Sequence, residues 1–446
     1  MRRTRTAAAR AAAALVAVLA AAGQMSAGAA EPVKTPNVTR TASYPYVGGS
    51  EITFDGDYVY AGYINGRIYR DERGYDNQGG VLIFDVSDGE FTKVGELSCP
   101  GNDNDVMVVR PGLLAISHHR SRCNFAARGG NGIYLADVSN PRQPRVISQL
   151  AIPSAHTLTV HPTGDFIYVS PGGLANDNGW QTVVDVSDPS RPFVASRFLP
   201  SVTGCHDMSF HLTQQRQLAF CAGAGEIQTW DVSNPVNPVT IGRIMNPAIQ
   251  FPHNAVVSPS GDKLVVNDEA FGIHDCTTGT SLYGSLWIYD IRVPEAPVLA
   301  GRIAPPATRS GVGNYVEYVG TWCTAHNYNF VPGTNLVVSS WFTGGTTVHD
   351  ITNPLLPELV ASYMPDDGLA YTAHWYRDRI YVNDKFLGME VLSVTGVSEG
   401  TLPAAKLTGP RVDMTSRLMP PVLPDRPVRT RERKMENTLF CVITPL

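Results

Sequence analysis

The residues best suited to chemistry in this chain of 446 residues are histidines that return at one place in a repeated pattern. Each opens a short strand-like run, as in HTLTV or HNAVV, and two further runs have a carboxylate at this place. The aligned residues are Glu51, Asp105, His156, His206, His253, His326 and His374. Imidazole and carboxylate groups are ligands for copper, zinc or iron, and three ligands with an open position would allow chemistry on bound water or substrate.

Two interpretations of this histidine register are open. In the first, each histidine bonds a neighbouring repeat and holds adjacent strands together. In the second, some of these residues bind a metal or a ligand. The metal ligands would then come from His206, His253, His326 and His374, whereas Glu51, Asp105 and His156 would contact the ligand. Five imidazoles cannot all bind one small ion, so pairs of neighbours are the expected geometry.

Other polar side chains are expected at the same face, at the ends of the second strands of the repeats. They are His118, His119, Asp268, Glu269, Asp384 and Lys385. We take Asp268 and Asp384 from this set as ligand-binding candidates, with solvated turns as the alternative. The segment 305–323 precedes His326 and contains Tyr315, Tyr318 and Trp322, so it is a lid, an aromatic binding wall or an ordinary loop.

The elements that must position these residues are predicted from an internal repeat. Runs such as TVVDVSDPSRP and IQTWDVSNPVNP occur six times, and a degraded seventh copy begins at Met389. The copies follow one another at about 40 to 60 residues, and each unit has four β-rich runs separated by turn residues. The sequence therefore predicts an all-β fold, a seven-bladed β-propeller with four-stranded blades. The repeated aspartates are expected to build turns rather than to catalyse.

The propeller is expected to span residues 37–400. Residues 37–45 resemble the fourth runs of the units, which predicts that an N-terminal strand completes the last blade and closes the ring. Residues 401–446 are a Pro/Arg-rich extension. Residues 1–30 combine a basic start, a short apolar stretch and small residues near Ala29 and Ala30, which is typical of a secretion signal.

The charge and hydropathy of the chain limit its partners. Asp and Glu number 40 against 35 Lys and Arg, and an acidic body disfavours nucleic acid. No segment is apolar for long enough to cross a membrane as a helix. We therefore expect a secreted or extracytoplasmic protein whose partner is a cell-surface protein, a glycan or a small ligand.

Seven cysteines in an exported chain suggest disulfides. Cys99 with Cys123, and Cys205 with Cys221, lie symmetrically about turns, as cross-strand partners in a hairpin would. A pair of Cys276 with Cys323 follows by elimination and leaves Cys441 unpaired.

The repeated Asp-Val-Ser-Asp/Asn-Pro motif, with a histidine opening the first strand of several units, resembles the LVIVD-repeat family of secreted β-propellers over residues 37–400. The resemblance implies a propeller outside the cytoplasm and no single established activity. A more remote likeness is to the selenium-binding-protein and methanethiol-oxidase propellers, which use histidines around the channel for a metal.

Two functions are compatible with these observations. The first is an exported binding scaffold with a histidine-lined channel face. The alternative is a metal-dependent enzyme containing copper, zinc or iron, above all an oxidoreductase, with Asp105 as acid, base or ligand. Phosphate-binding GxxxxGK[ST], HExxH and GxSxG motifs are all missing, so the sequence names no reaction.

Overall fold

The computed structural model describes most of the predicted propeller. The described residues are 32–64, 79–98, 105–118, 131–171, 179–200, 204–223, 225–270, 278–308 and 322–402. The predicted signal, residues 1–30, and all but the first two residues of the predicted extension lie outside this part of the chain.

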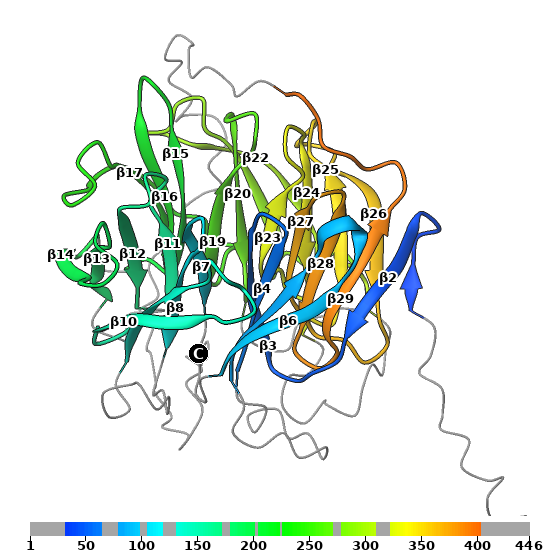
Figure 1. Ribbon diagram of the computed structural model, residues 1–446. Coiled ribbons are helices and arrows are strands. Elements are labelled where there is room, and N and C mark those ends of the chain that lie inside the picture. The colour runs from blue at the N-terminus through cyan, green and yellow to red at the C-terminus, as the bar shows by residue number, and fades with distance from the viewer. Residues whose placement is uncertain are drawn as a thin grey trace, which may run out of the picture.

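Seven antiparallel sheets form the fold and are arranged in a ring (Figure 1); six have four strands, and the sheet of blade 6 has a fifth, β1 (Val33–Lys34), at its outer edge. Blade 1 contains β3 (Gly49–Asp55), β4 (Tyr58–Tyr63), β5 (Gly80–Asp85) and β6 (Thr92–Ser98). Blade 2 contains β7 (Val106–Arg110), β8 (Leu113–His118), β9 (Gly132–Asp137) and β10 (Arg145–Ala151). Blade 3 contains β11 (Thr157–Val160), β12 (Phe166–Ser170), β13 (Gln181–Asp185) and β14 (Phe193–Phe198).

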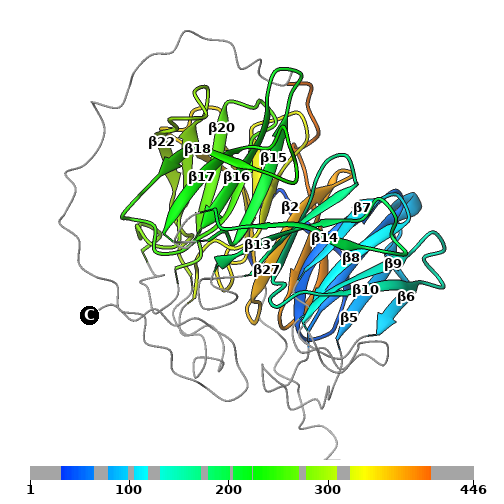
Figure 2. The ribbon, with the colours of Figure 1, turned by 90° about the vertical axis from the view of Figure 1, so that its left-hand side faces the viewer.

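The remaining blades continue the same order (Figure 2). Blade 4 contains β15 (Asp207–Leu212), β16 (Gln217–Gly223), β17 (Glu226–Asp231) and β18 (Val239–Ile244). Blade 5 contains β19 (Pro252–Val257), β20 (Lys263–Asp268), β21 (Leu286–Asp290) and β22 (Val298–Ile303). Blade 6 contains β23 (Tyr328–Phe330), β24 (Leu336–Ser340), β25 (Thr346–Asp350) and β26 (Glu358–Met364). Blade 7 contains β27 (Ala370–Tyr376), β28 (Arg379–Asp384) and β29 (Gly388–Val394).

The N-terminal strand closes the ring. Strand β2 (Val38–Tyr44) pairs antiparallel with β29, and Figure 1 shows the two side by side in blue and orange. Arg40 lies 2.9 Å from the buried carboxylate of Glu390, which also accepts a hydrogen bond from Tyr363. The predicted closure by an N-terminal strand is therefore confirmed. A short strand β1 (Val33–Lys34), which the sequence did not predict, pairs with β26.

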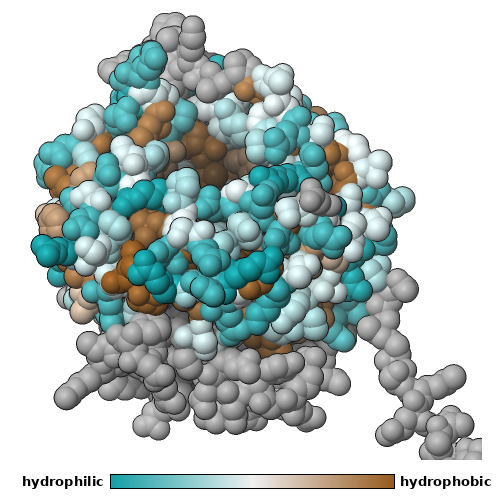
Figure 3. Space-filling view, in the orientation of Figure 1, coloured by the Kyte–Doolittle hydropathy of each residue, from teal (hydrophilic) through white to brown (hydrophobic). Residues whose placement is uncertain are grey.

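Burial explains the order of the strands within a blade. The second and third strands are apolar along nearly their whole length, and neighbouring blades cover both of their faces, as in β8 and β9. The outer strands are half exposed and mix polar with apolar residues. Figure 3 shows the resulting surface, largely hydrophilic, with hydrophobic residues in a hollow in the upper half of the view and in smaller patches elsewhere on this face. The first strands are left to line the centre.

The repeated aspartates build turns. Each accepts a hydrogen bond from the main-chain N–H two residues further on, as Asp137 does from Ser139 at 3.0 Å and Asp185 from Ser187 at 2.9 Å. This local bond ends the third strand of a blade and turns the chain toward the fourth. The predicted structural role of these residues is confirmed.

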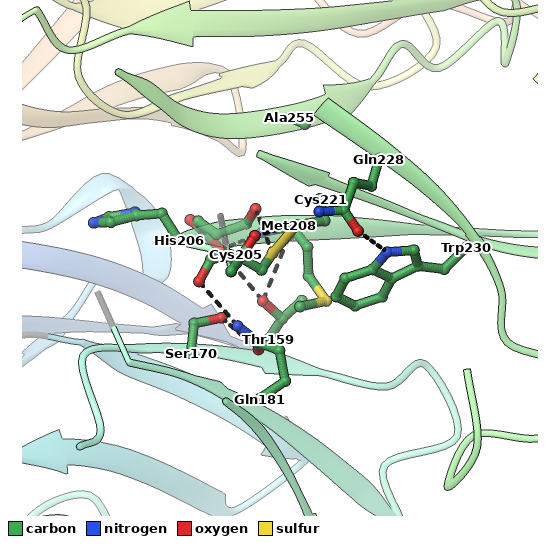
Figure 4. Close-up of a disulfide and its surroundings, with 12 residues drawn as sticks. Thr159, Ser170, Gln181, Cys205, His206, Met208, Cys221, Gln228, Trp230 and Ala255 are labelled. Carbon is green, nitrogen blue, oxygen red and sulfur yellow. Dashed lines mark hydrogen bonds between the residues drawn. A yellow bond between two sulfur atoms is a disulfide. The ribbon is translucent and has the colours of Figure 1, made fainter. Parts of the chain in front are cut away.

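One predicted disulfide lies within the described residues. Cys205 is bonded to Cys221 and ties the start of the inner strand of blade 4 to β16 (Figure 4). The Cys205 carbonyl also accepts a hydrogen bond from Gln181 at 2.9 Å, so blade 3 is anchored at the same point. Cys323 is disulfide-bonded as well. Its predicted partner Cys276 lies outside the described residues, as do Cys99, Cys123 and Cys441.

We expect a Cys205→Ala/Cys221→Ala variant to unfold more easily than the wild type. The bond joins residues that are 16 apart in sequence, and its loss increases the freedom of the unfolded chain. For a loop of this length the free energy of unfolding should fall by about 2–4 kcal/mol. Urea titration followed by circular dichroism measures this change. Equal stability of variant and wild type would contradict the expectation.

Candidate functional site

Four of the predicted histidines lie side by side at the start of consecutive inner strands. They are His156, His206, His253 and His326, from blades 3 to 6. Neighbouring ring centroids are 4.8 Å, 4.2 Å and 4.4 Å apart. We call the place that these residues occupy the mouth position. It is held by Ser50 in blade 1 and by Tyr371 in blade 7, and in blade 2 it lies outside the described residues.

His374 does not share this place, contrary to the predicted register. It lies three residues beyond Tyr371, pairs with Tyr381 in the middle of β27, and its ring is 6.5 Å from that of Phe54. The turn at Arg377 and Asp378 follows His374 closely, whereas the other histidines stand well before their turns. Counting back from the turn would have identified Tyr371 as the equivalent residue. The geometry therefore separates His374 from the other histidines.

Glu51 and Asp105 lie one residue beyond the mouth position. Asp105 exchanges main-chain and side-chain hydrogen bonds with Ser117 as Asn327 does with Ser340. We call this second place the inner position. Its residues are Glu51, Asp105, Thr157, Asp207, Asn254, Asn327 and Thr372. The two predicted carboxylates thus belong to a second layer in the channel, which the sequence alignment merged with the histidines.

Hydrogen bonds from one blade to the next converge on the mouth-position carbonyls. In blades 4 and 6 a histidine ring makes the bond, from His206 Nδ1 to the His253 carbonyl at 3.1 Å and from His326 Nδ1 to the Tyr371 carbonyl at 2.7 Å. Other side chains donate to main-chain carbonyls in the same way: Ser117 to His156, Thr157 to His206, Asn267 to His326, Ser340 to Tyr371 and Thr372 to Ser50. The interpretation of the histidines as contacts between blades therefore holds for His206 and His326.

The same bonds prepare a histidine to bind a metal. A ring that donates its Nδ1–H to a carbonyl keeps the lone pair of Nε2 available. The Nε2 atoms of His253 and His326 lie 3.7 Å and 3.9 Å from the two carboxylate oxygens of Glu269. One ligand atom from each of the three residues can be chosen so that all lie within 4.8 Å of one another. His253, His326 and Glu269 thus form the candidate metal centre.

Glu269 is held in place by its neighbour Asp268. The Asp268 carboxylate accepts main-chain N–H bonds from Gln250, Phe251 and Gly284 at 2.9–3.0 Å, which fixes the loop after β20. Asp384 has the equivalent place after β28 and accepts bonds from Phe386 and Leu387. Both aspartates, predicted to contact a ligand, anchor loops in this structure, and only Oδ1 of Asp384 takes part in the bonds to Phe386 and Leu387. The residues that follow them, Glu269 and Lys385, turn toward the histidines.

Burial sets the protonation states of the site. It lowers the pKa of His253 and His326 well below the usual value and that of His156 to about 4, so these rings are neutral near pH 7. It raises the pKa of Glu269 to about 8, with a further contribution from the charge of Asp268. Neutral imidazole is the form that binds metals, whereas Glu269 must lose a proton to do so.

The inner position forms an acidic layer beneath the histidines. Burial raises the pKa of Asp105 to about 7 and those of Glu51 and Asp207 well above the usual value. Hydrogen bonds hold one or both oxygens of each group, as Thr372 and Asn327 do for Glu51. The sequence analysis did not select Asp207, although it directly follows His206.

Two further predicted features lie only partly in the described residues. His118 is buried and its ring stacks on Tyr134 with centroids 4.1 Å apart, whereas His119 lies outside the described part. In the segment 305–323, residues 309–321 lie outside it as well, so the predicted lid is not tested. Trp322 stacks on Phe342 at 4.0 Å, and Phe342 lies 4.8 Å from the His326 ring. Trp322 and Phe342 thus lie beside His326, whereas Tyr315 and Tyr318 of the predicted wall lie outside the described residues.

Comparison with known proteins agrees with the repeat and the fold. The LVIVD repeat family matches residues 156–199, which begin at His156 and span blade 3. A β-propeller domain of Cps50 (Swd1) from Myceliophteria thermophila aligns with TM-score 0.53 at 12% identity, covering 80% of this chain and 100% of that one. The periplasmic gluconolactonase PpgL of Pseudomonas aeruginosa aligns with TM-score 0.52 at 12% identity, covering 71% and 86%.

At such low identity these likenesses concern the fold alone. No curated protein matches the chain by sequence, and the likeness to selenium-binding-protein propellers gains no support from these matches. None of the described residues forms a helix that could span a membrane. The chain is a seven-bladed β-propeller that carries an LVIVD repeat.

Proposed function

We propose that this protein is an exported binding propeller that holds one transition-metal ion at the channel mouth and binds a small ligand there. The observation that carries the proposal is the convergence of His253, His326 and Glu269, whose ligand atoms lie within 4.8 Å of one another. Two imidazole nitrogens and a carboxylate oxygen suit copper, zinc or iron. Three protein ligands leave a coordination position open for the ligand.

The three residues would have to move closer together to bind an ion. Ligand atoms bound tetrahedrally at about 2 Å from a metal are roughly 3.3 Å apart. The nitrogen-to-oxygen distances of 3.7 Å and 3.9 Å go to the two different oxygens of Glu269, and a set with one ligand atom from each residue spans up to 4.8 Å. His326 is already oriented by its bond to the Tyr371 carbonyl, so the adjustment falls mainly on Glu269.

A metal-dependent enzyme, in the first place an oxidoreductase, is the second candidate. The open coordination position favours it, together with Tyr371, whose ring centroid lies 3.9 Å from that of His326. Metal-dependent turnover of an oxidisable substrate would distinguish the enzyme from a protein that only binds.

The proposal of export rests on residues 1–30 and is supported by the Cys205–Cys221 bond, since disulfides persist in oxidising compartments. N-terminal sequencing of protein recovered outside the cell would show cleavage near Ala29 or Ala30.

We expect the wild-type protein to bind about one equivalent of copper(II) or zinc, and a Glu269→Gln variant to bind it at least tenfold more weakly. The amide keeps the shape of the side chain but loses the anionic oxygen, and even a group that only orients a metal ligand is worth about tenfold or more in affinity. Elemental analysis after dialysis and titration calorimetry measure stoichiometry and affinity.

His374→Ala is the matched control for the metal-binding experiment. It removes a half-buried imidazole from the same ring of strands without touching the candidate centre, so metal affinity should stay at the wild-type value. Circular dichroism checks that both variants fold. Loss of metal in His374→Ala, or its full retention in Glu269→Gln, would contradict the assignment.

Metal binding should release a proton at slightly acid pH. With a pKa of about 8, Glu269 is protonated at pH 6.5 in the metal-free protein, while the neighbouring histidines are already neutral. An ion that binds Glu269 therefore displaces about one proton at pH 6.5 and almost none at pH 9.5, so affinity rises with pH up to about 8. Calorimetry in two buffers of different ionisation enthalpy counts the protons. No release at pH 6.5 would contradict the assignment of Glu269.

A further inference from the structure

We infer that the ligand of the metal centre is a small oxyanion, with one oxygen on the metal and another at the amine of Lys385. This inference rests on the proposed metal site and names the class of ligand that the site would bind. Four observations carry it: how Lys385 is held, where its amine lies, what faces it, and the charge that a bound metal would create.

The main chain fixes Lys385 at the channel. Its N–H donates to the Leu369 carbonyl at 3.0 Å, and its own carbonyl accepts a hydrogen bond from Gly48 at 2.8 Å. The residue is 3% exposed. The side chain therefore cannot extend into solvent, and its amine stays inside the protein.

The amine lies next to the candidate metal centre. Its nitrogen is 3.4 Å from the centre of the Tyr371 ring, and that ring is 3.9 Å from the ring of His326. The face of an aromatic ring stabilises an ammonium group. The charge of Lys385 also acts on His326, His156 and Glu269, as their shifted pKa values record. The amine is thus directed into the space that the histidines surround.

The fold places a carboxyl group and an amine on the two sides of an aromatic wall. Glu269 in blade 5 and Lys385 in blade 7 each follow an aspartate that anchors a loop. Each also donates its main-chain N–H to the carbonyl of the residue directly before the inner strand of its own blade. Blade 6 has Phe342 at the corresponding place, beside Trp322. A ligand at this point meets a metal-binding carboxylate on one side, an amine on the other and aromatic rings between them.

The charge of the metal-bound site then favours an anionic ligand. A divalent ion with Glu269 as its only anionic ligand leaves a buried site with excess positive charge, which is unfavourable unless compensated; burial lowers the pKa of Lys385 to about 7, so its amine adds to this charge when it is protonated. The other acids of the channel offer little compensation, because burial raises the pKa of Asp105 to about 7 and that of Glu51 well above its usual value. A carboxylate or a phosphate has the two oxygens that the metal and the amine require.

The test uses the full-length protein loaded with copper(II), with acetate, inorganic phosphate and neutral acetamide as probes. We expect acetate or phosphate to bind and to change the copper spectrum, and acetamide to bind at least tenfold more weakly. Lys385→Met should keep the copper stoichiometry and lose at least tenfold in anion affinity, and Lys385→Arg should restore part of it. Lys263→Met, in β20 and paired with Asp262, is the matched control and should behave as the wild type.

The outcomes separate the two proposals. Copper binding with equal anion affinity in the wild type and Lys385→Met overturns the oxyanion inference alone. Failure of the wild type to bind metal overturns the proposed function and this inference with it. If Lys385→Met does not fold, the preference of the wild type for acetate over acetamide decides, because equal affinity for both contradicts a charged recognition group. Binding of acetate alone assigns a carboxylate ligand, and binding of phosphate alone assigns inorganic phosphate.

Discussion

The ring of blades depends on hydrogen bonds from one blade to a main-chain carbonyl at the start of the next inner strand, which occur at six of the seven interfaces in the described part of the chain. Such a carbonyl is buried and has no strand partner on its channel side, so leaving it unpaired would be costly. Serine, threonine, asparagine and histidine side chains all supply the donor at different interfaces, as Ser117 and His326 illustrate. The requirement is for a donor of suitable reach, and the sequence satisfies it with whichever residue also suits the local neighbourhood. Apolar packing between blades supplies the bulk of the stability, whereas these bonds fix where the inner strands begin.

This constraint makes the two interpretations of the histidines, as contacts between blades and as metal ligands, compatible with each other. A histidine that bonds the next blade through Nδ1 is locked in the tautomer that presents Nε2 as a metal ligand, so His326 can serve both roles at once. A serine at the same place would satisfy the carbonyl and offer nothing to a metal. His253 differs, because its Nδ1 has no hydrogen-bond partner among the described residues. Its orientation must come from the rings of His206 and His326 on either side of it.

Much of the fold could be predicted from the sequence because each blade corresponds to one sequence repeat. Turn aspartates such as Asp185 act through local bonds that depend only on adjacent residues, and the N-terminal strand was recognisable by its likeness to other outer strands. The site was less predictable because it depends on register. Strands β3, β19 and β27 each carry an irregularity near the mouth position, so aligning residues by type placed His374 with residues three positions away. Glu269 could not be told from Asp268 by sequence, since which of two adjacent acids anchors the loop depends on backbone N–H groups from Phe251 and Gly284.

The position after an anchored aspartate shows how a repeated scaffold can acquire a specific site. Asp268 in blade 5 and Asp384 in blade 7 each accept hydrogen bonds from main-chain N–H groups, yet the residues that follow them are a glutamate and a lysine. Because the anchor fixes the main chain, the next side chain can change its charge without changing the path of the loop. The functional difference between blades therefore lies beside the repeated residues and not in them. A search for function in a propeller of this kind should begin with side chains that are buried at the channel, differ between blades and follow a residue whose carboxylate anchors the main chain.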